Sequence, residues 1–76
     1  MDAEQLITMA NDIATFYASA SGAAKAPADV AGHLRRQWEP RMRRAIIELW
    51  RANDPHLSEV ARGAVALLAA EAPRPQ

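Results

Sequence analysis

The side chains best suited to chemistry in this sequence are arginines gathered in its middle. Residues 33–51 contain six arginines, no lysine and two glutamates, a formal charge of +4 that the rest of this neutral chain balances with −4. Guanidinium groups bind carboxylates and phosphates through planar, bidentate hydrogen bonds, so the pattern favours recognition of an anionic partner. The alternative is a salt-bridged, solvated helix face, because residues four apart can pair as Arg35–Glu39, Glu39–Arg43 and Arg44–Glu48.

Aromatic and imidazole side chains lie within the same segment. Trp38 and Trp50 have the size and the helical spacing of core residues, although Trp and Arg are also common anchors of protein interfaces. His33 follows Asp29 by four residues, so on a helix the two can pair as ordinary surface residues. These residue types favour binding over proton transfer.

The sequence offers little for catalysis or metal binding. It has no cysteine, two histidines and three glycines, which provides no thiolate nucleophile, no zinc module and no glycine-rich phosphate loop. The serines have no evident supporting triad, and the nine carboxylates are scattered along the chain. We expect no catalytic residue, no metal ligand and no cofactor-binding residue in this chain.

Composition predicts one small domain. Half of the 76 residues are hydrophobic, but 18 of these are alanine, so the core is thin and a partner surface would add stability. The absence of cysteine favours a reducing compartment, and the sequence shows neither a basic leader nor an apolar run of the roughly 18 residues that a membrane span needs. We expect a cytoplasmic protein with no membrane span, a single helical domain over residues 1–72 and a disordered tail at 73–76.

Apolar periodicity predicts an all-α fold, a small bundle of three to four helices. Asp2, with Gln5 three residues later, can cap a first helix that ends at Ser21 and Gly22. Its predicted inner stripe holds Leu6, Met9, Ile13, Phe16 and Tyr17. A second helix is predicted from about residue 27 to residue 38, with an inner stripe of Val30, Ala31, Leu34 and Trp38.

Pro40 predicts a break between the second and third helices. Inside a helix a proline costs about 3 kcal/mol, whereas the first turn tolerates it, so the chain should turn at Trp38 and Glu39. The third helix then begins at Pro40, with Met42, Ile46, Leu49 and Trp50 facing inward, and ends at Asn53-Asp54-Pro55. Asp54 can cap a last helix, whose predicted inner face holds Leu57, Val60, Ala61, Ala64, Leu67 and Leu68.

Two blocks of the sequence carry a resemblance to a known family. Residues 9–13 read MANDI, with Phe16 after them, and residues 33–44 read HLRRQWEPRMRR. The second block is the more specific, because it is long and rich in rarely used residues. Over about residues 4–50 the chain resembles the delta subunit of the soluble, NAD-dependent, molybdenum-containing formate dehydrogenases.

The resemblance implies a non-catalytic accessory subunit. In that family the alpha subunit holds the bis-molybdopterin guanine dinucleotide cofactor and iron–sulfur clusters, the beta subunit holds FMN and the NAD site, and the gamma subunit carries a further cluster. The delta subunit has no metal cofactor of its own. We therefore expect this chain to bind the alpha subunit and to support its cofactor-loaded state, in a complex that also contains beta and gamma.

The break at Pro40 is the predicted centre of partner binding. Trp38 and Met42 would provide apolar anchors, and arginines would reach carboxylates or carbonyls of the partner. The full predicted set is His33, Arg36, Trp38, Pro40, Arg41, Met42, Arg43 and Arg44. Two alternatives remain open: a nucleic-acid-binding module, which the acidic charge elsewhere and the lack of lysine in the cluster make unlikely, and a module that self-associates through its Trp and Leu faces.

Overall fold

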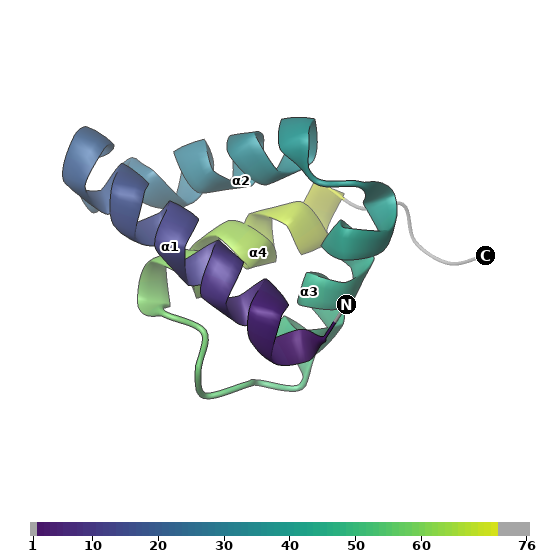
Figure 1. Ribbon diagram of the computed structural model, residues 1–76. Helices are drawn as coiled ribbons and strands as arrows, with labels where there is room; N and C mark the ends of the chain where they lie inside the picture. The colour runs from purple at the N-terminus through teal and green to yellow at the C-terminus, as the bar shows by residue number, and fades with distance from the viewer. Residues whose placement is uncertain (1, 72–76) are drawn as a thin grey trace.

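The computed structural model describes residues 2–71, so the predicted tail at 73–76 lies outside the described residues. The described part contains four helices and no strand: α1 (Ala3–Ser21), α2 (Ala26–Gln37), α3 (Pro40–Arg51) and α4 (Glu59–Glu71). α4 lies at the centre of the arrangement and contacts each of the other three helices (Figure 1). The predicted all-α bundle is confirmed, with the larger of the two expected helix numbers.

The ends of α1 follow the predicted backbone chemistry. The Asp2 carboxylate accepts the backbone N–H of Gln5 at 2.8 Å, which satisfies one of the free donors at the helix start. Gly22 ends the helix with a φ of 85°, a left-handed value that glycine adopts without steric cost. Both ends of the first helix are therefore specified locally.

The break before Pro40 is also confirmed. Trp38 and Glu39 have extended backbone conformations between α2 and α3, and Pro40 is the first residue of α3. The Trp38 N–H still bonds the Leu34 carbonyl at 3.0 Å, so α2 is hydrogen-bonded up to the break. At its other end α2 begins at Ala26, slightly before the predicted start.

The end of α3 is a Schellman motif built on Asn53. Asn53 has a φ of 59°, and its N–H bonds the Trp50 carbonyl at 2.9 Å. The N–H of Asp54 bonds the Leu49 carbonyl at 3.1 Å, which completes the paired bonds of this motif. The helix stops because asparagine tolerates the left-handed conformation, as the Asn53-Asp54-Pro55 sequence predicted.

The core combines a few large side chains with many small ones. Leu34, Ile46, Val30 and Val65 are the largest fully buried residues. Six alanines are buried with them: Ala10, Ala14, Ala26, Ala31, Ala61 and Ala64. Since a methyl group adds little bulk, such positions let helices pack closely, and this use of alanine compensates for the small number of large apolar residues.

Two residues expected in the core lie outside it. Phe16 is 63% exposed and Leu67 is 42% exposed, so both predictions were wrong. In α1 the buried face is centred on Leu6, Ala10 and Ala14, and Phe16 lies two residues, or about 200°, from Ala14. The large residues do not mark the buried stripe at this end of α1, because alanine lines its inner face.

The connection between α3 and α4 is attached to α1 by Asn11. Its side-chain amide donates to the His56 carbonyl at 2.8 Å, and its side-chain oxygen accepts the Ser58 N–H at 2.9 Å. The Ser58 hydroxyl in turn accepts the Ala61 N–H at 3.2 Å and so caps α4. The prediction that Asp54 caps the last helix was wrong, because the Asp54 carboxylate accepts the N–H of His56 within the preceding turn.

Arg62 of α4 also binds the connection between α3 and α4, through three hydrogen bonds. Its Nε donates to the Leu57 carbonyl at 3.0 Å, its Nη1 to Asn53 Oδ1 at 2.7 Å, and its Nη2 to the Asp54 carbonyl at 2.8 Å. A planar guanidinium can serve three acceptors at once, which the single ammonium of lysine does less well. The loop is therefore fixed by one side chain from each of two helices.

Two helical glycines should respond differently to alanine. A Cβ at Gly32 would lie 3.2 Å from Nη1 of Arg36, the movable end of an exposed side chain, whereas a Cβ at Gly63 would lie 3.3 Å from Cβ of Pro27. We expect Gly32→Ala to raise the free energy of unfolding by about 0.5–1 kcal/mol through helix propensity, and Gly63→Ala to gain nothing because α4 is pushed from α2. Urea unfolding followed by circular dichroism checks this, and equal gains would contradict it.

Candidate functional site

The arginines of the basic segment adopt different roles from those expected. Arg35 bonds Glu71 at the end of α4, with its Nη2 2.6 Å from a carboxylate oxygen, and Arg51 bonds Glu48 at 3.1 Å. Arg43 donates from Nη1 to the Arg35 carbonyl at 3.2 Å and to the Trp38 carbonyl. None of the three expected i,i+4 pairs is an ion pair among the described residues, where Arg35 pairs with Glu71 and Glu48 pairs with Arg51.

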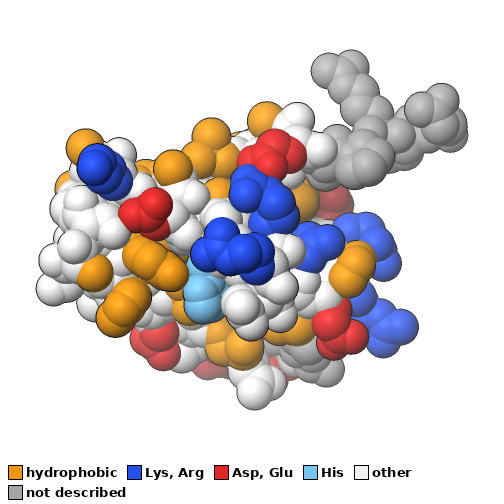
Figure 2. Space-filling view, turned by 90° about the horizontal axis from the view of Figure 1, so that it is seen from above, with side chains coloured by type: hydrophobic (Ala, Val, Ile, Leu, Met, Phe, Trp, Pro, Cys, Tyr) orange, Lys and Arg blue, Asp and Glu red, His pale blue; other side chains and the backbone are white. Residues whose placement is uncertain are grey.

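Three other arginines have no carboxylate partner within the described part of the chain: Arg36, Arg41 and Arg44. All three are exposed, and they lie in the last turn of α2 and the first half of α3. Figure 2 shows most of the Lys and Arg side chains gathered on one side of the molecule, with one basic side chain apart from them. The fold therefore leaves uncompensated positive charge beside the helix break.

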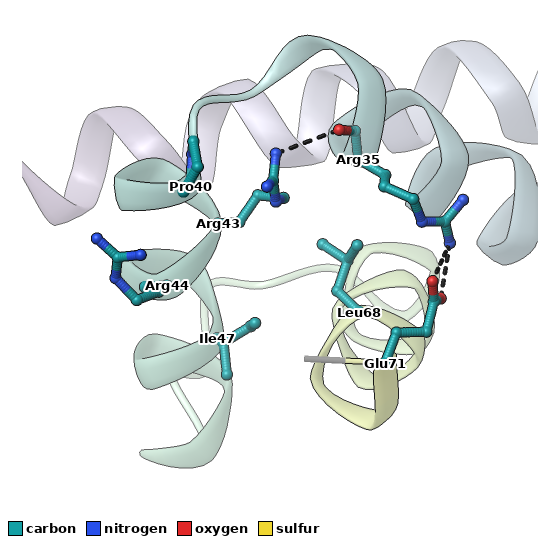
Figure 3. Close-up of a pocket in the computed structure, with 7 residues that line it drawn as sticks. All are labelled: Arg35, Pro40, Arg43, Arg44, Ile47, Leu68 and Glu71. Atoms are coloured by element: carbon teal, nitrogen blue, oxygen red, sulfur yellow. Dashed lines mark hydrogen bonds and ion pairs between the residues drawn. The ribbon is translucent and has the colours of Figure 1, made fainter. Parts of the chain in front are cut away.

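A groove of about 530 Å³ opens between α3 and α4 next to this charge. Its apolar lining is provided by Pro40 and Ile47 from α3 and by Leu68 from α4. Figure 3 shows Ile47 and Leu68 extending from α3 and α4 into the space between these helices, with the Arg35–Glu71 ion pair on the far side of Leu68. Arg43 and Arg44 complete the lining, so the groove joins an apolar floor to a cationic border.

The structure brings together only some of the residues predicted to bind a partner. Pro40, Arg43 and Arg44 line the groove, and Arg36 and Arg41 are exposed nearby in sequence. Met42 is partly buried against the core. The partner-binding role of the set stays a prediction.

Trp38 and His33 lie in environments other than an open surface. Trp38 is 6% exposed and belongs to the core cluster, so its ring packs inside this chain and leaves little area as an exposed anchor. His33 packs against Tyr17, with ring centroids 5.9 Å apart and Nδ1 3.5 Å from the tyrosine oxygen. The expected pairing of His33 with Asp29 is not among the ion pairs of the described residues.

Four lining residues of the groove were outside the predicted set: Arg35, Ile47, Leu68 and Glu71. Arg35 and Glu71 are 36 positions apart in the chain, so no local spacing signals their contact. Leu68 was assigned to the core face of the last helix, and it is indeed buried, but its edge also forms the groove floor. Finding this site requires knowing that α4 packs beside α3.

Metal binding and membrane insertion find no support in the described residues. No group of three or more His, Cys, Asp or Glu side chains among residues 2–71 is arranged to hold a metal ion. Within the same residues, no helix combines the length and the apolar character that crossing a membrane requires.

Fold and groove together define a small all-α protein with a basic, partly apolar surface groove. A family model for the NADH-dependent formate dehydrogenase delta subunit, FdsD, matches residues 5–65, which include both blocks that carried the resemblance. The chain belongs to this family, and it is thus a delta subunit associated with an NAD-dependent formate dehydrogenase complex. Searches of the curated proteins and of the solved structures gave no match.

Proposed function

We propose that this chain is a non-catalytic accessory subunit that binds the molybdenum-cofactor-bearing alpha subunit of formate dehydrogenase and supports its cofactor-loaded state. The observation that carries the proposal is membership of the delta-subunit family over residues 5–65. In this proposal the chain itself holds no cofactor. The bis-molybdopterin guanine dinucleotide, the iron–sulfur clusters and FMN belong to the alpha, beta and gamma subunits.

The basic surface and its groove support a binding role. Arg36, Arg41 and Arg44 are exposed without a carboxylate partner in the described residues, and Arg44 lines the groove with its apolar floor. Interfaces commonly join a desolvated apolar centre to a polar rim that sets orientation and association rate. Such a surface suits a large protein partner.

A pull-down of the tagged full-length chain from its native cells tests the proposal. We expect the eluate to contain the formate dehydrogenase alpha subunit by mass spectrometry, molybdenum and iron by elemental analysis, and formate-dependent reduction of NAD⁺. The purified chain alone should show none of that activity. Elution of the chain alone, or with nucleic acid in place of the enzyme, would contradict the proposal.

Deletion of the chain separates a supporting role from simple attachment. If the delta subunit supports the cofactor-loaded state, the alpha subunit prepared without it should contain less molybdenum per polypeptide, and its activity should fall in proportion. Re-expression of the chain in the deletion background is the control. Unchanged molybdenum content would restrict the function to attachment.

A further inference from the structure

We propose that the groove between α3 and α4 binds an acidic peptide segment of the partner protein, with an apolar side chain on the groove floor and a carboxylate on Arg44. This inference rests on the proposed function and specifies the surface and the chemistry through which the chain binds. The proposed site is formed by residues of α3 and α4 together, whereas the sequence pattern predicted binding at the break before Pro40 alone.

The groove floor fits an apolar side chain. Pro40 is exposed at the start of α3, whereas Ile47 and Leu68 are 6% and 5% exposed and contribute only their edges to the floor. A side chain inserted here would contact the exposed Pro40 and the edges of Ile47 and Leu68 without displacing a buried polar group. The gain from such contacts grows with the apolar area removed from water.

The cationic border is not fully neutralised. Three arginines and one glutamate line the groove, a formal charge of +2. The Glu71 carboxylate pairs with Arg35, and the Arg43 guanidinium donates hydrogen bonds to the backbone carbonyls of Arg35 and Trp38. Arg44 is exposed and has no such contact among the described residues, so it is the guanidinium best placed to receive a carboxylate from outside.

The same features favour a peptide over the two other occupants. Nucleic acid would engage the arginines through phosphates, but a phosphate backbone gains nothing from a floor of Pro40, Ile47 and Leu68. A second copy could offer the acidic surface around Asp2, Glu4 and Asp54, which lies at a different site of the chain. Such a contact would join unlike surfaces, so it would build rings or open chains of copies instead of a two-fold dimer.

Charge reversal at matched positions of α3 tests the site. Arg44→Glu should weaken capture of the formate dehydrogenase alpha subunit by the full-length chain about tenfold, because the groove would then repel a carboxylate. Arg51→Glu makes the same change of charge at the other end of the same helix, at an exposed arginine outside both the groove lining and the predicted partner-binding set, and should change capture less than about threefold. Equal losses of capture at both positions would indicate a general electrostatic attraction and would contradict the groove as the binding site. Circular dichroism confirms that both variants are folded.

Chemical cross-linking identifies the bound group. The chain has one lysine, Lys25, which lies before α2 and away from the groove lining. Arg44→Lys keeps the charge and places an amine at the groove, where a zero-length carbodiimide would join it to a partner carboxylate. We expect mass spectrometry to find position 44 linked to an acidic peptide of the partner, and Arg51→Lys to give no link to the partner. Links to the partner from Lys25 or position 51 alone would overturn the proposal.

The outcomes separate the two proposals. If the wild-type chain does not capture the alpha subunit, the proposed function fails. If the wild-type chain captures it and Arg44→Glu captures it equally well, only the groove is wrong. If nucleic acid co-elutes with the wild-type chain and Arg44→Glu abolishes this, the groove binds nucleic acid. If the wild-type chain self-associates in sedimentation and Arg44→Glu abolishes this, the groove binds a second copy. Either result would overturn the proposal of a bound peptide.

Discussion

Replacing Trp38 with alanine should cost about 3–5 kcal/mol of the free energy of unfolding, because it removes the largest side chain of the core cluster and leaves a cavity. Trp38 is 6% exposed at the break between α2 and α3, so its ring contributes to the core where the helix direction changes. Small domains are stable by about 0.05–0.15 kcal/mol per residue, so the loss removes much of the total. Urea unfolding monitored by circular dichroism measures it.

A matched aromatic provides the control for Trp38. Phe16→Ala removes another large ring, but one that is 63% exposed, and should cost no more than about 1 kcal/mol, mainly through its edge contact with Tyr17. Similar losses for the two variants would contradict the assignment of Trp38 to the core. Trp38→Phe keeps most of the apolar volume, so a folded variant of this kind is the proper test of any direct contact between residue 38 and the alpha subunit.

Replacing Arg62 with alanine should cost about 2–3 kcal/mol, which lowers the unfolding midpoint by roughly 10–20 °C in a domain of this size. The change removes three charge-assisted hydrogen bonds to Leu57, Asn53 and Asp54, and the loop loses its attachment to α4. The carbonyls are partly accessible to water, which keeps the cost below the sum of three buried bonds. Thermal unfolding followed by circular dichroism gives the midpoint.

Two further variants separate the contribution of the Arg62 geometry from that of its charge. Arg62→Lys keeps the charge but not the three-way fork, and it should recover less than half of the loss. Arg51→Ala removes an arginine whose only described ion pair is the exposed contact with Glu48, so its effect should stay within about 0.5 kcal/mol. Amide hydrogen exchange across residues 53–58 should accelerate only in the Arg62 variants. An Arg62→Ala variant as stable as Arg51→Ala would contradict the role of this clamp.

The ends of the helices could be predicted because each depends on a few neighbouring residues. Asp2 caps its own helix, Gly22 adopts a conformation that other residues avoid, and the ring of Pro40 excludes a continuous helix. Asn53 ends α3 through bonds to residues within the preceding turn. These interactions span at most five positions, so the linear sequence contains all the information they need.

The buried faces of the helices could be predicted less well than the helix ends. Large apolar residues at helical spacing identified Leu34, Ile46 and Leu68 correctly, since such residues are most often buried. Phe16 and Leu67 are exposed because the faces that meet are decided by which helices pack together, and here the alanine-lined sides fit more closely. Periodicity gives a helix its apolar side only approximately when small residues share that side.

By itself the sequence determined an all-α protein, the break at Pro40, the excess of arginine around it and, through the block at residues 33–44, the delta-subunit family. Only the tertiary structure decided which arginines are neutralised. Arg35 meets Glu71 across 36 positions, and Arg43 bonds carbonyls at the end of α2, so Arg44 is left exposed beside a floor made by two helices. The reason is that charge partners and grooves depend on distances in space, which the packing of α4 against the other helices sets.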